Sequence, residues 1–262
     1  MIKPYDILKA IKERKPLIHH ITNWVTIYDC ANITRAFGAL PVMAHAREEA
    51  AEMAGIASAL VLNIGTLTPE LIDSMIVAGK KANQKKIPII LDAVGAGATK
   101  LRTKSTSKLM SRLRIDVVKG NAGEIASIAG SEAEVRGVES MGVKGDITEI
   151  AKELALKKKT VVVVTGKVDV ITDGKRIFKV LNGDARMGSV VGTGCMSASI
   201  IASFCSVEKD HAKAAAAALC CFGIAGELAA KKSEGPGTFK EKFYDEASKL
   251  DEKGIETLKK IQ

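Results

Sequence analysis

Short apolar runs alternate with longer amphipathic segments along almost the whole chain. Runs rich in Val, Ile and Leu predict buried strands, and apolar residues repeating every three or four positions predict helices. The predicted strands are Leu17–Ile21, Ala39–Met43, Ala59–Ile64, Ile87–Ala93, Ile115–Val118 and Val161–Thr165. The helices expected between them are Asn23–Phe37, Ala46–Ala54, Pro69–Asn83, Ser105–Leu113, Ala122–Ile128 and Ile147–Leu156. Repeated strand–helix units predict a mostly parallel sheet with helices on both faces.

The later part of the chain departs from this alternation. Asp173 and Gly174 separate two β-rich runs, Val168–Thr172 and Arg176–Val180, and Asp-Gly in this setting predicts a hairpin that adds an antiparallel edge. Helices are then expected at Cys195–Val207, Ala212–Lys232 and Thr238–Leu250, with a short one after Asp251. Because no Pro/Ser-rich linker divides the chain, we expect one α/β domain over residues 1–262, with three α/β/α layers.

Composition narrows the class of protein. Hydrophobic residues make up 47% and charged residues 26%, which argues against a disordered or fibrous chain. The net charge of +9 leaves nucleic acid, an anionic membrane or phosphorylated ligands open as partners. The lysines are scattered in pairs such as Lys80-Lys81, and aromatic residues, which could stack on bases, are only 4%. A Lys-rich solvated surface is therefore the favoured interpretation, with a nucleic-acid-binding protein as the alternative.

Cysteines and apolar stretches indicate the compartment. The five cysteines form no C-x-x-C pair, so neither zinc binding nor a thioredoxin-like motif is supported. Their odd number and an amphipathic start, rather than a signal peptide, favour reduced thiols in the cytoplasm. The most apolar stretch, Ala214–Gly226, is shorter than the ~18 residues that suggest a membrane span, so no membrane association is expected.

A Gly-rich turn opens the first of the late helices. Gly192, Thr193 and Gly194 precede Cys195 there, and glycines let several backbone N–H groups point at one site. With the positive end of the helix, they would form an anion hole suited to a phosphate. The same field would lower the pKa of Cys195. The alternative is a plain turn followed by a core cysteine.

Charged residues also follow the predicted strands, where ligands bind in such sheets. Asp92 ends one strand, as a turn former or as a magnesium ligand together with Glu124. Lys119 and Glu124 surround Asn121, which reads either as a helix cap with a capping-box Glu or as part of a phosphate and metal site. Thr165 opens a turn that would contact a nucleotide or serve only as a turn.

The N-terminal part offers weaker signals. His19 and His20 are adjacent, so they cannot share a strand face and make a poor metal pair; one is expected in the core. Asn23 is expected to cap the next helix, and Met43 to lie in the core. Taken jointly, glycines, a helix N-terminus, acids and a lysine at strand ends favour phosphoryl transfer. Neither a P-loop nor an early G-x-G-x-x-G motif is present.

At this point the chain resembles the hydroxyethylthiazole kinase family of the ribokinase-like superfamily. The matching segments are HHITN (19–23), PVMAHAREE (41–49), ALVLNIGTL (59–67), LDAVGAGATKLRT (91–103), KGNAGEI (119–125), VVVTGKVDVITDG (162–174), GTGC (192–195) and GPGTF (235–239). They follow the family order from one end of the chain to the other. GTGC also occurs in hydroxymethylpyrimidine kinases, whereas the ITN, PVM and NIGTL segments are more diagnostic.

The resemblance implies transfer of the γ-phosphate of ATP to 4-methyl-5-(2-hydroxyethyl)thiazole with Mg²⁺, by a homotrimer whose sites lie between subunits. It implies a catalytic role for Cys195, at the position of an Asp in most ribokinase-like enzymes. The other implied roles are thiazole binding by Asn23, Met43, Gly65 and Gly192, ATP binding by Lys119, Thr165, Thr193 and Gly194, and metal or phosphate binding by Asp92 and Glu124.

Three positions depart from the family pattern. Lys119 replaces the usual Arg, Val191 replaces a Thr, and Ala93 replaces a Pro. The first two change the expected nucleotide contacts, since Lys offers a point charge in place of a bidentate fork. Two related activities stay open as alternatives. A hydroxymethylpyrimidine kinase would carry a Gly/Ser-rich early motif that this chain lacks, and an ATP-dependent NAD(P)H-hydrate dehydratase would keep an Asp at position 195.

Overall fold

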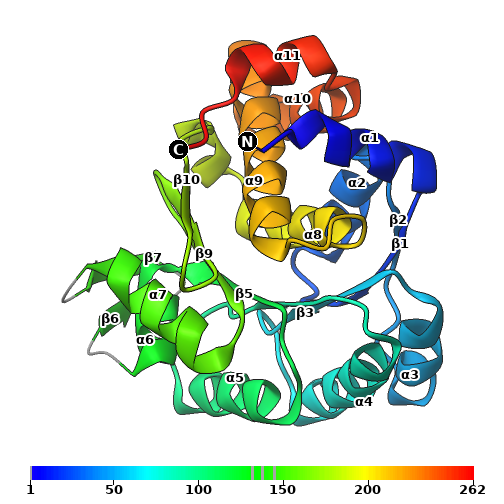
Figure 1. Cartoon of the computed structure of the whole chain (residues 1–262), viewed down its shortest axis with the longest axis vertical. Coiled ribbons are helices and arrows are strands. Elements are labelled where there is room, and N and C mark those ends of the chain that lie inside the picture. Colours follow the sequence, from blue (N-terminus) through cyan, green and yellow to red (C-terminus); the bar gives the residue numbers. More distant parts are fainter. Residues whose placement is uncertain (1, 131–132, 137–138, 144–145) are drawn as a thin grey trace.

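A computed structural model describes the chain apart from residues 1, 131–132, 137–138 and 144–145. Its centre is an eight-stranded sheet in the order β10-β9-β8-β5-β4-β3-β1-β2 (Figure 1). The strands are β1 (Leu17–Ile21), β2 (Leu40–Val42), β3 (Ala59–Asn63), β4 (Ile89–Asp92), β5 (Val117–Asn121), β8 (Val161–Thr165), β9 (Asp169–Thr172) and β10 (Ile177–Val180). β1 to β5 and β8 run parallel, and β9 and β10 form the antiparallel edge. The predicted fold class is confirmed.

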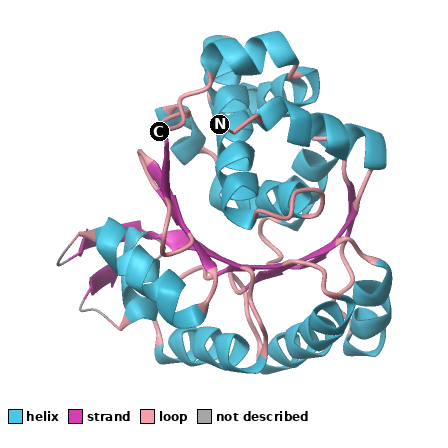
Figure 2. Ribbon diagram, in the orientation of Figure 1, coloured by secondary structure: helices cyan, strands magenta, loops and turns pink. Residues whose placement is uncertain are grey.

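Helices cover both faces of the curved sheet (Figure 2). The concave face holds α1 (Pro4–Arg14), α2 (Ile27–Ala36), α8 (Thr193–Cys205), α9 (His211–Lys231), α10 (Pro236–Lys249) and α11 (Glu252–Leu258). The convex face holds α3 (Arg47–Ile56), α4 (Pro69–Lys85), α5 (Lys100–Arg112), α6 (Ala122–Ala129) and α7 (Ile147–Lys158). A short 3₁₀ helix, η1 (Ala185–Ser189), precedes α8.

The strands separate two apolar cores. Val61 and Ile90 face the core under α8 and α9, whereas Leu60 and Leu91 face the core under α4 and α5. Because side chains alternate along a strand and both faces are covered, the strands read as continuous apolar runs. This is why the sequence predicted them well.

α9 is long and apolar enough to cross a membrane by composition. However, 83% of its apolar window is buried inside the protein. It packs against α8 and α10 in the core under the concave face, through residues such as Ala214, Cys221 and Ile224. It is therefore accounted for as a core helix.

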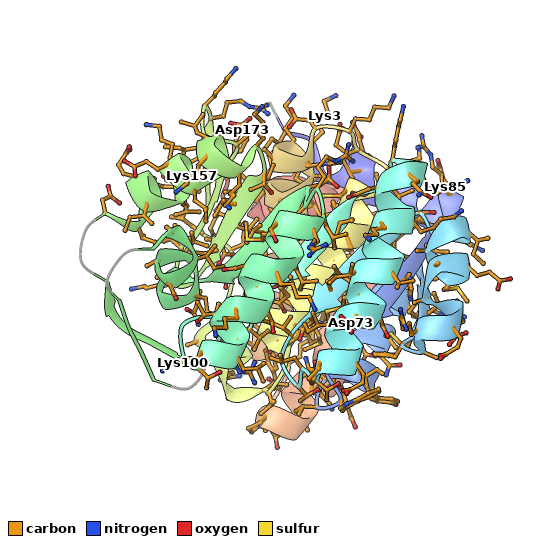
Figure 3. All side chains as sticks on the ribbon, turned by 90° about the horizontal axis from the view of Figure 1, so that it is seen from below. Lys3, Asp73, Lys85, Lys100, Lys157 and Asp173 are labelled. Atoms are coloured by element: carbon orange, nitrogen blue, oxygen red, sulfur yellow. The ribbon has the colours of Figure 1, made fainter. Side chains whose placement is uncertain are left out.

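Charged side chains extend from the helices over the surface (Figure 3). Lys85, Lys100 and Lys157 lie on three different helices, and Lys108 of α5 pairs with Asp73 of α4 at 3.0 Å. The pair is exposed on both sides, and such pairs contribute little to stability. These lysines are spread over several helices, as the solvated-surface interpretation expects.

Two helix boundaries and one pair of strands differ from the prediction in ways that matter. The helix expected from Asn23 begins at Ile27 after Thr26, so Asn23 is not its cap. α5 begins at Lys100 rather than Ser105, because its first turn is polar and hides the apolar period. A two-stranded hairpin, β6 (Ala133–Arg136) and β7 (Glu139–Val143), lies beside α6 and was not predicted, since its charged, Gly-containing sequence lacks an apolar run.

Candidate active site

Three neighbouring strands end in a row of polar side chains. The parallel register aligns Asn63 with Asp92, and Asp92 with Lys119. All three side chains are buried. Asn63 Nδ2 donates to Asp92 Oδ2 at 2.5 Å, and Lys119 Nζ donates to Asp92 Oδ1 at 3.0 Å. The carboxyl ends of β3, β4 and β5 are therefore joined by one polar network.

Lys119 carries a positive charge within this row. Burial alone would lower the pKa of its ammonium group, but Asp92, Cys195 and Glu124 together raise it above the ordinary value. A buried lysine keeps its charge only when such partners compensate for lost hydration. Lys119 therefore supplies a fixed positive charge at the strand ends, and its contact with a phosphate stays a prediction.

The turn before α8 faces this charge. Gly192 has φ +96°, and a Cβ atom there would lie only 2.5 Å from Thr26 Cγ2, so the position requires glycine. A Cβ atom at Gly194 would lie 3.3 Å from Lys119 Nζ, which places the ammonium against the start of α8. Among the residues that the structure describes, no side chain caps this helix end. Its N–H groups and Lys119 thus converge on one place, where an anion would be stabilised.

Cys195 lies in the first turn of α8, where its Sγ accepts a hydrogen bond from Asn23 Nδ2 at 3.4 Å. The prediction that its pKa is lowered is wrong. Burial raises the pKa of the Cys195 thiol and Asp92 raises it further, against the opposing effects of Lys119, Thr26 and Asn63. Desolvation is the largest of these effects, and a pKa above the ordinary value keeps the side chain a neutral thiol near pH 7.

Asn23 and Gly65 meet beside Cys195. Asn23 Nδ2 also donates to Asn63 Oδ1 at 2.9 Å, and Asn23 Oδ1 accepts from the Thr26 N–H at 3.0 Å. A Cβ atom at Gly65 would lie 2.9 Å from Asn23 Cβ, so the loop after β3 packs directly on Asn23. Two of the residues predicted to line the thiazole pocket are therefore brought together with Cys195.

Asn63 was missed by sequence reasoning although it connects these groups. Its Oδ1 accepts from Asn23 Nδ2 and from the Gly65 N–H, and its Nδ2 donates to Asp92. The signal available was a lone polar residue at the end of the apolar run ALVLN. Its side-chain partners, Asn23 and Asp92, lie 40 and 29 positions away in the sequence, so spacing gave no sign of them.

Glu124 is confirmed as a capping-box residue, and its role at a phosphate and metal site stays a prediction. It forms a capping box with Asn121, and its Oε2 accepts the Asn121 N–H at 2.7 Å. Its Oε1 accepts the Gly95 N–H from the neighbouring loop at 2.6 Å. Burial raises the pKa of the Glu124 carboxyl, although Lys119 and the two N–H groups oppose that shift. The cap therefore holds a carboxylate close to Asp92 and Lys119.

Asp92 and Glu124 could supply only part of the ligand set of a magnesium ion. Within the part of the chain that the structure describes, no three His, Cys, Asp or Glu side chains gather into a metal-binding group. Mg²⁺ commonly takes one or two carboxylates and fills its remaining positions with water and substrate phosphates. Asp92 and Glu124 fit that donor set, and they do not form an all-protein cage.

The remaining predicted site residues have other partners than the polar row at Asp92. Thr165 ends β8 opposite Asn121, and its hydroxyl donates to Gly120 O at 3.4 Å. Thr193 donates to the carbonyls of Met187 and Val190, so its hydroxyl shapes the Gly-rich turn. Met43 follows β2 and packs against the core under the concave face, as a core residue would. Nucleotide contacts of Thr165 and Thr193 and a thiazole contact of Met43 stay predictions.

The two N-terminal histidines are both buried, although only one was expected in the core. His20 Nδ1 lies 3.0 Å from Ile18 O and Nε2 lies 3.1 Å from Ser199 Oγ. Burial lowers the pKa of His20 to about 3, so the ring is neutral. His19 Nε2 contacts Ala44 O at 2.8 Å. Both rings are parts of the core rather than a metal pair.

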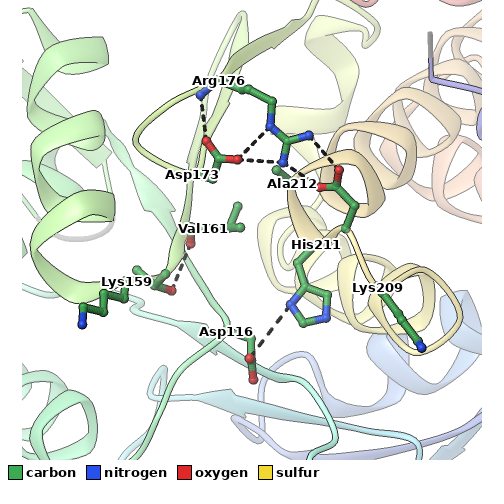
Figure 4. A pocket seen from close by; sticks show the side chains of 10 residues that line it. Asp116, Lys159, Val161, Asp173, Arg176, Lys209, His211 and Ala212 are labelled. Atoms are coloured by element: carbon green, nitrogen blue, oxygen red, sulfur yellow. Dashed lines mark hydrogen bonds and ion pairs between the residues drawn. The ribbon is translucent and has the colours of Figure 1, made fainter.

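A separate pocket of about 380 Å³ lies at the opposite, amino end of the strands. In it Arg176 lies between Asp173 and Asp210, with 2.7 Å contacts to both, and His211 points toward Asp116 at 4.0 Å (Figure 4). The Arg176 guanidinium is thus paired with two carboxylates inside this pocket. Ligands of such sheets bind at the carboxyl ends, so the chemistry belongs to the row at Asp92.

Comparison with known proteins gives the family of the chain. The model of the "Hydroxyethylthiazole kinase family" matches residues 8–253. A hydroxyethylthiazole kinase of Methanosarcina mazei is 60% identical over 255 residues, covering 97% of this chain and 98% of that protein. One from Thermoanaerobacter pseudethanolicus is 56% identical over 259 residues, covering 98% of each.

Solved structures give the same family and the wider fold. The hydroxyethylthiazole kinase protein of Pyrococcus horikoshii OT3 is 42% identical and superposes with a TM-score of 0.91, covering 99% of this chain and 98% of that one. A ribokinase-like superfamily protein of Enterococcus faecalis is 15% identical with a TM-score of 0.65 over 94% of each chain, which establishes the fold alone. The fold is thus ribokinase-like, and the chain belongs to the hydroxyethylthiazole kinase family.

Proposed function

We propose that the protein transfers the γ-phosphate of ATP to the hydroxyl group of 4-methyl-5-(2-hydroxyethyl)thiazole in thiamine salvage, acting as a single kinase domain. The observation that carries the proposal is the meeting of two half-sites at the start of α8. Lys119 and the open helix end form an anion site, and Asn23 and Gly65 adjoin Cys195 beside it. An alcohol held by the second half-site would face a phosphate held by the first.

The chain's own groups account for most of the chemistry required. Phosphoryl transfer proceeds through a loose transition state, so positioning and charge neutralisation matter more than a strong base. Lys119 and the N-terminus of α8 would stabilise charge on the transferred group. Cys195 is a neutral thiol held by Asn23, so its proposed role is to orient the substrate hydroxyl by hydrogen bonding. Thr165, Thr193 and Gly194 would contact the nucleotide.

Mg²⁺ is proposed as the accompanying cation, with Asp92 and Glu124 as the side chains that would hold it. Both carboxylates already accept hydrogen bonds from the protein, but each oxygen keeps a second lone pair. Bound there with ATP, the ion would neutralise negative charge on the phosphates.

A homotrimer with sites between subunits is proposed as the working form. Apolar side chains around the site are unusually exposed, with Trp24 at 58%, Tyr28 at 71% and Val191 at 72%. Trp24 follows Asn23 and Val191 precedes Gly192, so these side chains border the thiazole half-site. Clustered exposed apolar groups mark interaction surfaces, and a second copy would both cover them and close the pocket. Light scattering coupled to gel filtration would measure the assembly.

A cytoplasmic location and small-molecule partners complete the proposal. The described cysteines are free, and Cys30, Cys205, Cys220 and Cys221 are buried, as suits a reducing compartment. Neither nucleic acid nor a membrane is proposed as a partner.

The deciding experiment measures ATP consumption with magnesium when the thiazole alcohol and hydroxymethylpyrimidine are offered separately. Turnover with the thiazole alone is expected. Turnover with the pyrimidine alone would keep the anion site but discard the pocket at Asn23 and Gly65. Turnover with neither would contradict the kinase proposal and direct the test to hydrated NAD(P)H.

A further inference from the structure

Arg102 joins two loops that flank the site. It lies in the first turn of α5, and its partly buried guanidinium reaches between the loops that follow β3 and β4. Nη1 donates to Ile64 O at 2.8 Å and to Val94 O at 2.7 Å, and Nη2 donates to Gly65 O at 2.7 Å. One side chain therefore binds three carbonyl groups from two separate segments.

The loop after β3 is held on both sides by this contact. The peptide group between Ile64 and Gly65 gives its carbonyl to Arg102, and its N–H donates to Asn63 Oδ1 at 2.9 Å. Because a peptide group is planar, fixing both its oxygen and its N–H fixes its orientation. Gly65 is the residue that packs against Asn23, so Arg102 acts on the alcohol half-site.

The loop after β4 is held in the same manner. The peptide group between Val94 and Gly95 gives its carbonyl to Arg102, and its N–H donates to Glu124 Oε1 at 2.6 Å. This loop leaves directly from Asp92, which lies on the phosphate side. Gly95 has φ +73°, and a Cβ atom there would lie 2.9 Å from Arg102 Cδ, so the loop lies closely against the arginine.

The position of Arg102 is not explained by the helix that carries it. A cation in the first turn of a helix opposes the helix dipole. Across the described part of the chain Arg102 has no carboxylate within ion-pair distance, so the three carbonyl dipoles are what compensate for its charge. Its role is therefore to be sought in the loops it binds.

We propose that Arg102 is a positioning residue for phosphoryl transfer, which sets the alcohol half-site at Gly65 against the phosphate half-site beyond Asp92. The inference rests on the proposed function. A guanidinium can hold three carbonyls because its five N–H groups form a rigid fork, whereas a lysine ammonium is a compact point charge at the end of a flexible stem. Losing the fork would free the two loops to shift relative to each other, and small misplacements of reacting groups reduce rates strongly.

The test compares Arg102→Lys and Arg102→Ala with Arg112→Ala, an exposed arginine of the same helix that serves as the control. Wild-type turnover of the thiazole is measured first, so that failure of the proposed function is seen separately. Circular dichroism and thermal unfolding then give the folded fraction of each variant, and kinetics give kcat and KM for each substrate.

For Arg102→Lys we expect the thiazole KM to rise at least about tenfold and kcat to fall at least about tenfold, with the ATP KM within about threefold of wild type. ATP hydrolysis per thiazole phosphate formed should also rise, since a misplaced alcohol leaves the phosphate open to water. Arg112→Ala should match wild type. Should Arg102→Ala fail to fold, Arg102→Lys carries the test.

Two results would overturn the inference. The first is a folded Arg102→Lys enzyme with wild-type thiazole KM and kcat. The second is a loss of activity that follows only the folded fraction, with both KM values and the hydrolysis ratio unchanged.

Discussion

Replacing Gly192 with alanine tests whether the backbone conformation and the close packing of the turn before α8 require a glycine. Gly192 lies at φ +96°, where residues with a side chain are strained, and the added methyl group would meet Thr26 Cγ2 at 2.5 Å. Thr26 is itself buried and precedes α2, so it cannot withdraw freely. The substitution therefore adds two destabilising terms, one from the backbone conformation and one from the crowding of the new methyl group.

The two penalties can be estimated separately. The left-handed conformation costs a residue with a Cβ atom about 1–2 kcal/mol. Forcing a methyl group into a filled space costs about 1–3 kcal/mol. The free energy of unfolding should therefore fall by about 2–5 kcal/mol, provided that the two terms are independent. Gly188→Ala is the control, because Gly188 has no atom within 4 Å of the added Cβ and should change stability by less than about 0.5 kcal/mol.

Thr26→Ser separates the two terms, because it removes Cγ2 and keeps the hydroxyl that accepts from Cys30 Sγ. In the double variant with Gly192→Ala, most of the crowding term should be relieved, although the Cβ of residue 26 stays 3.0 Å from the added methyl group, and the conformational term should remain. We expect a favourable coupling of about 1–3 kcal/mol in urea unfolding at one fixed protein concentration. Gly192→Ala should also lower kcat, since the helix end moves away from Lys119.

The reasoning would be refuted by a Gly192→Ala variant as stable as Gly188→Ala. It would also fail if Thr26→Ser gave no coupling, because the crowding at Thr26 Cγ2 would then be absent in solution.

Three further expectations follow from the buried ionisable side chains. Lys119→Met removes one partner of a buried ion pair with Asp92 and should lower the free energy of unfolding by about 3–5 kcal/mol, measured by urea unfolding; a change below about 1 kcal/mol would contradict the pair. Burial lowers the pKa of His20 to about 3, so the contribution of the neutral ring to the free energy of unfolding is complete above pH 6.5. As the pH falls from 6.5 toward 3, this contribution is lost by about 1.4 kcal/mol per pH unit. The free energy of unfolding of a His20→Gln variant should therefore depend less on pH between pH 6.5 and 5. Cys195→Ala should reduce kcat without abolishing it, whereas Glu124→Gln should cost more because an amide cannot accept both backbone N–H groups; an inactive Cys195→Ala beside an active Glu124→Gln would reverse this ranking.

Much of the fold could be predicted because local pattern and burial agree. The strand Leu17–Ile21 was predicted to the residue, and Val161–Thr165 likewise, since both lie inside a sheet covered on two faces. The predicted boundaries were wrong where an element begins with polar residues, as at Lys100 of α5. The strands β6 and β7 were not predicted because their sequences carry no apolar run that would reveal them.

The site could be predicted in its residue types but not in its connections. Strand ends and a Gly-rich turn indicated Asp92, Lys119 and Cys195, because parallel topology brings such ends to one edge. The link from Asn23 to Cys195 spans 172 positions, so no local pattern encodes it. The pKa of Cys195 was predicted in the wrong direction for the same reason: its sign depends on burial and on Asp92, which are tertiary properties.

The charges gathered at the strand ends bear on the proposal that a polyanionic nucleotide binds there together with a cation. Asp92 and Glu124 bring two carboxylates to the row, and Lys119 supplies one ammonium in hydrogen-bonding contact with Asp92. The N-terminus of α8 adds only about half an elementary charge. A triphosphate placed against this balance would meet excess negative charge unless a cation accompanied it. The same carboxylates that oppose a bare nucleotide would favour one that carries a divalent ion, so the proposed metal site would select the metal complex of the nucleotide.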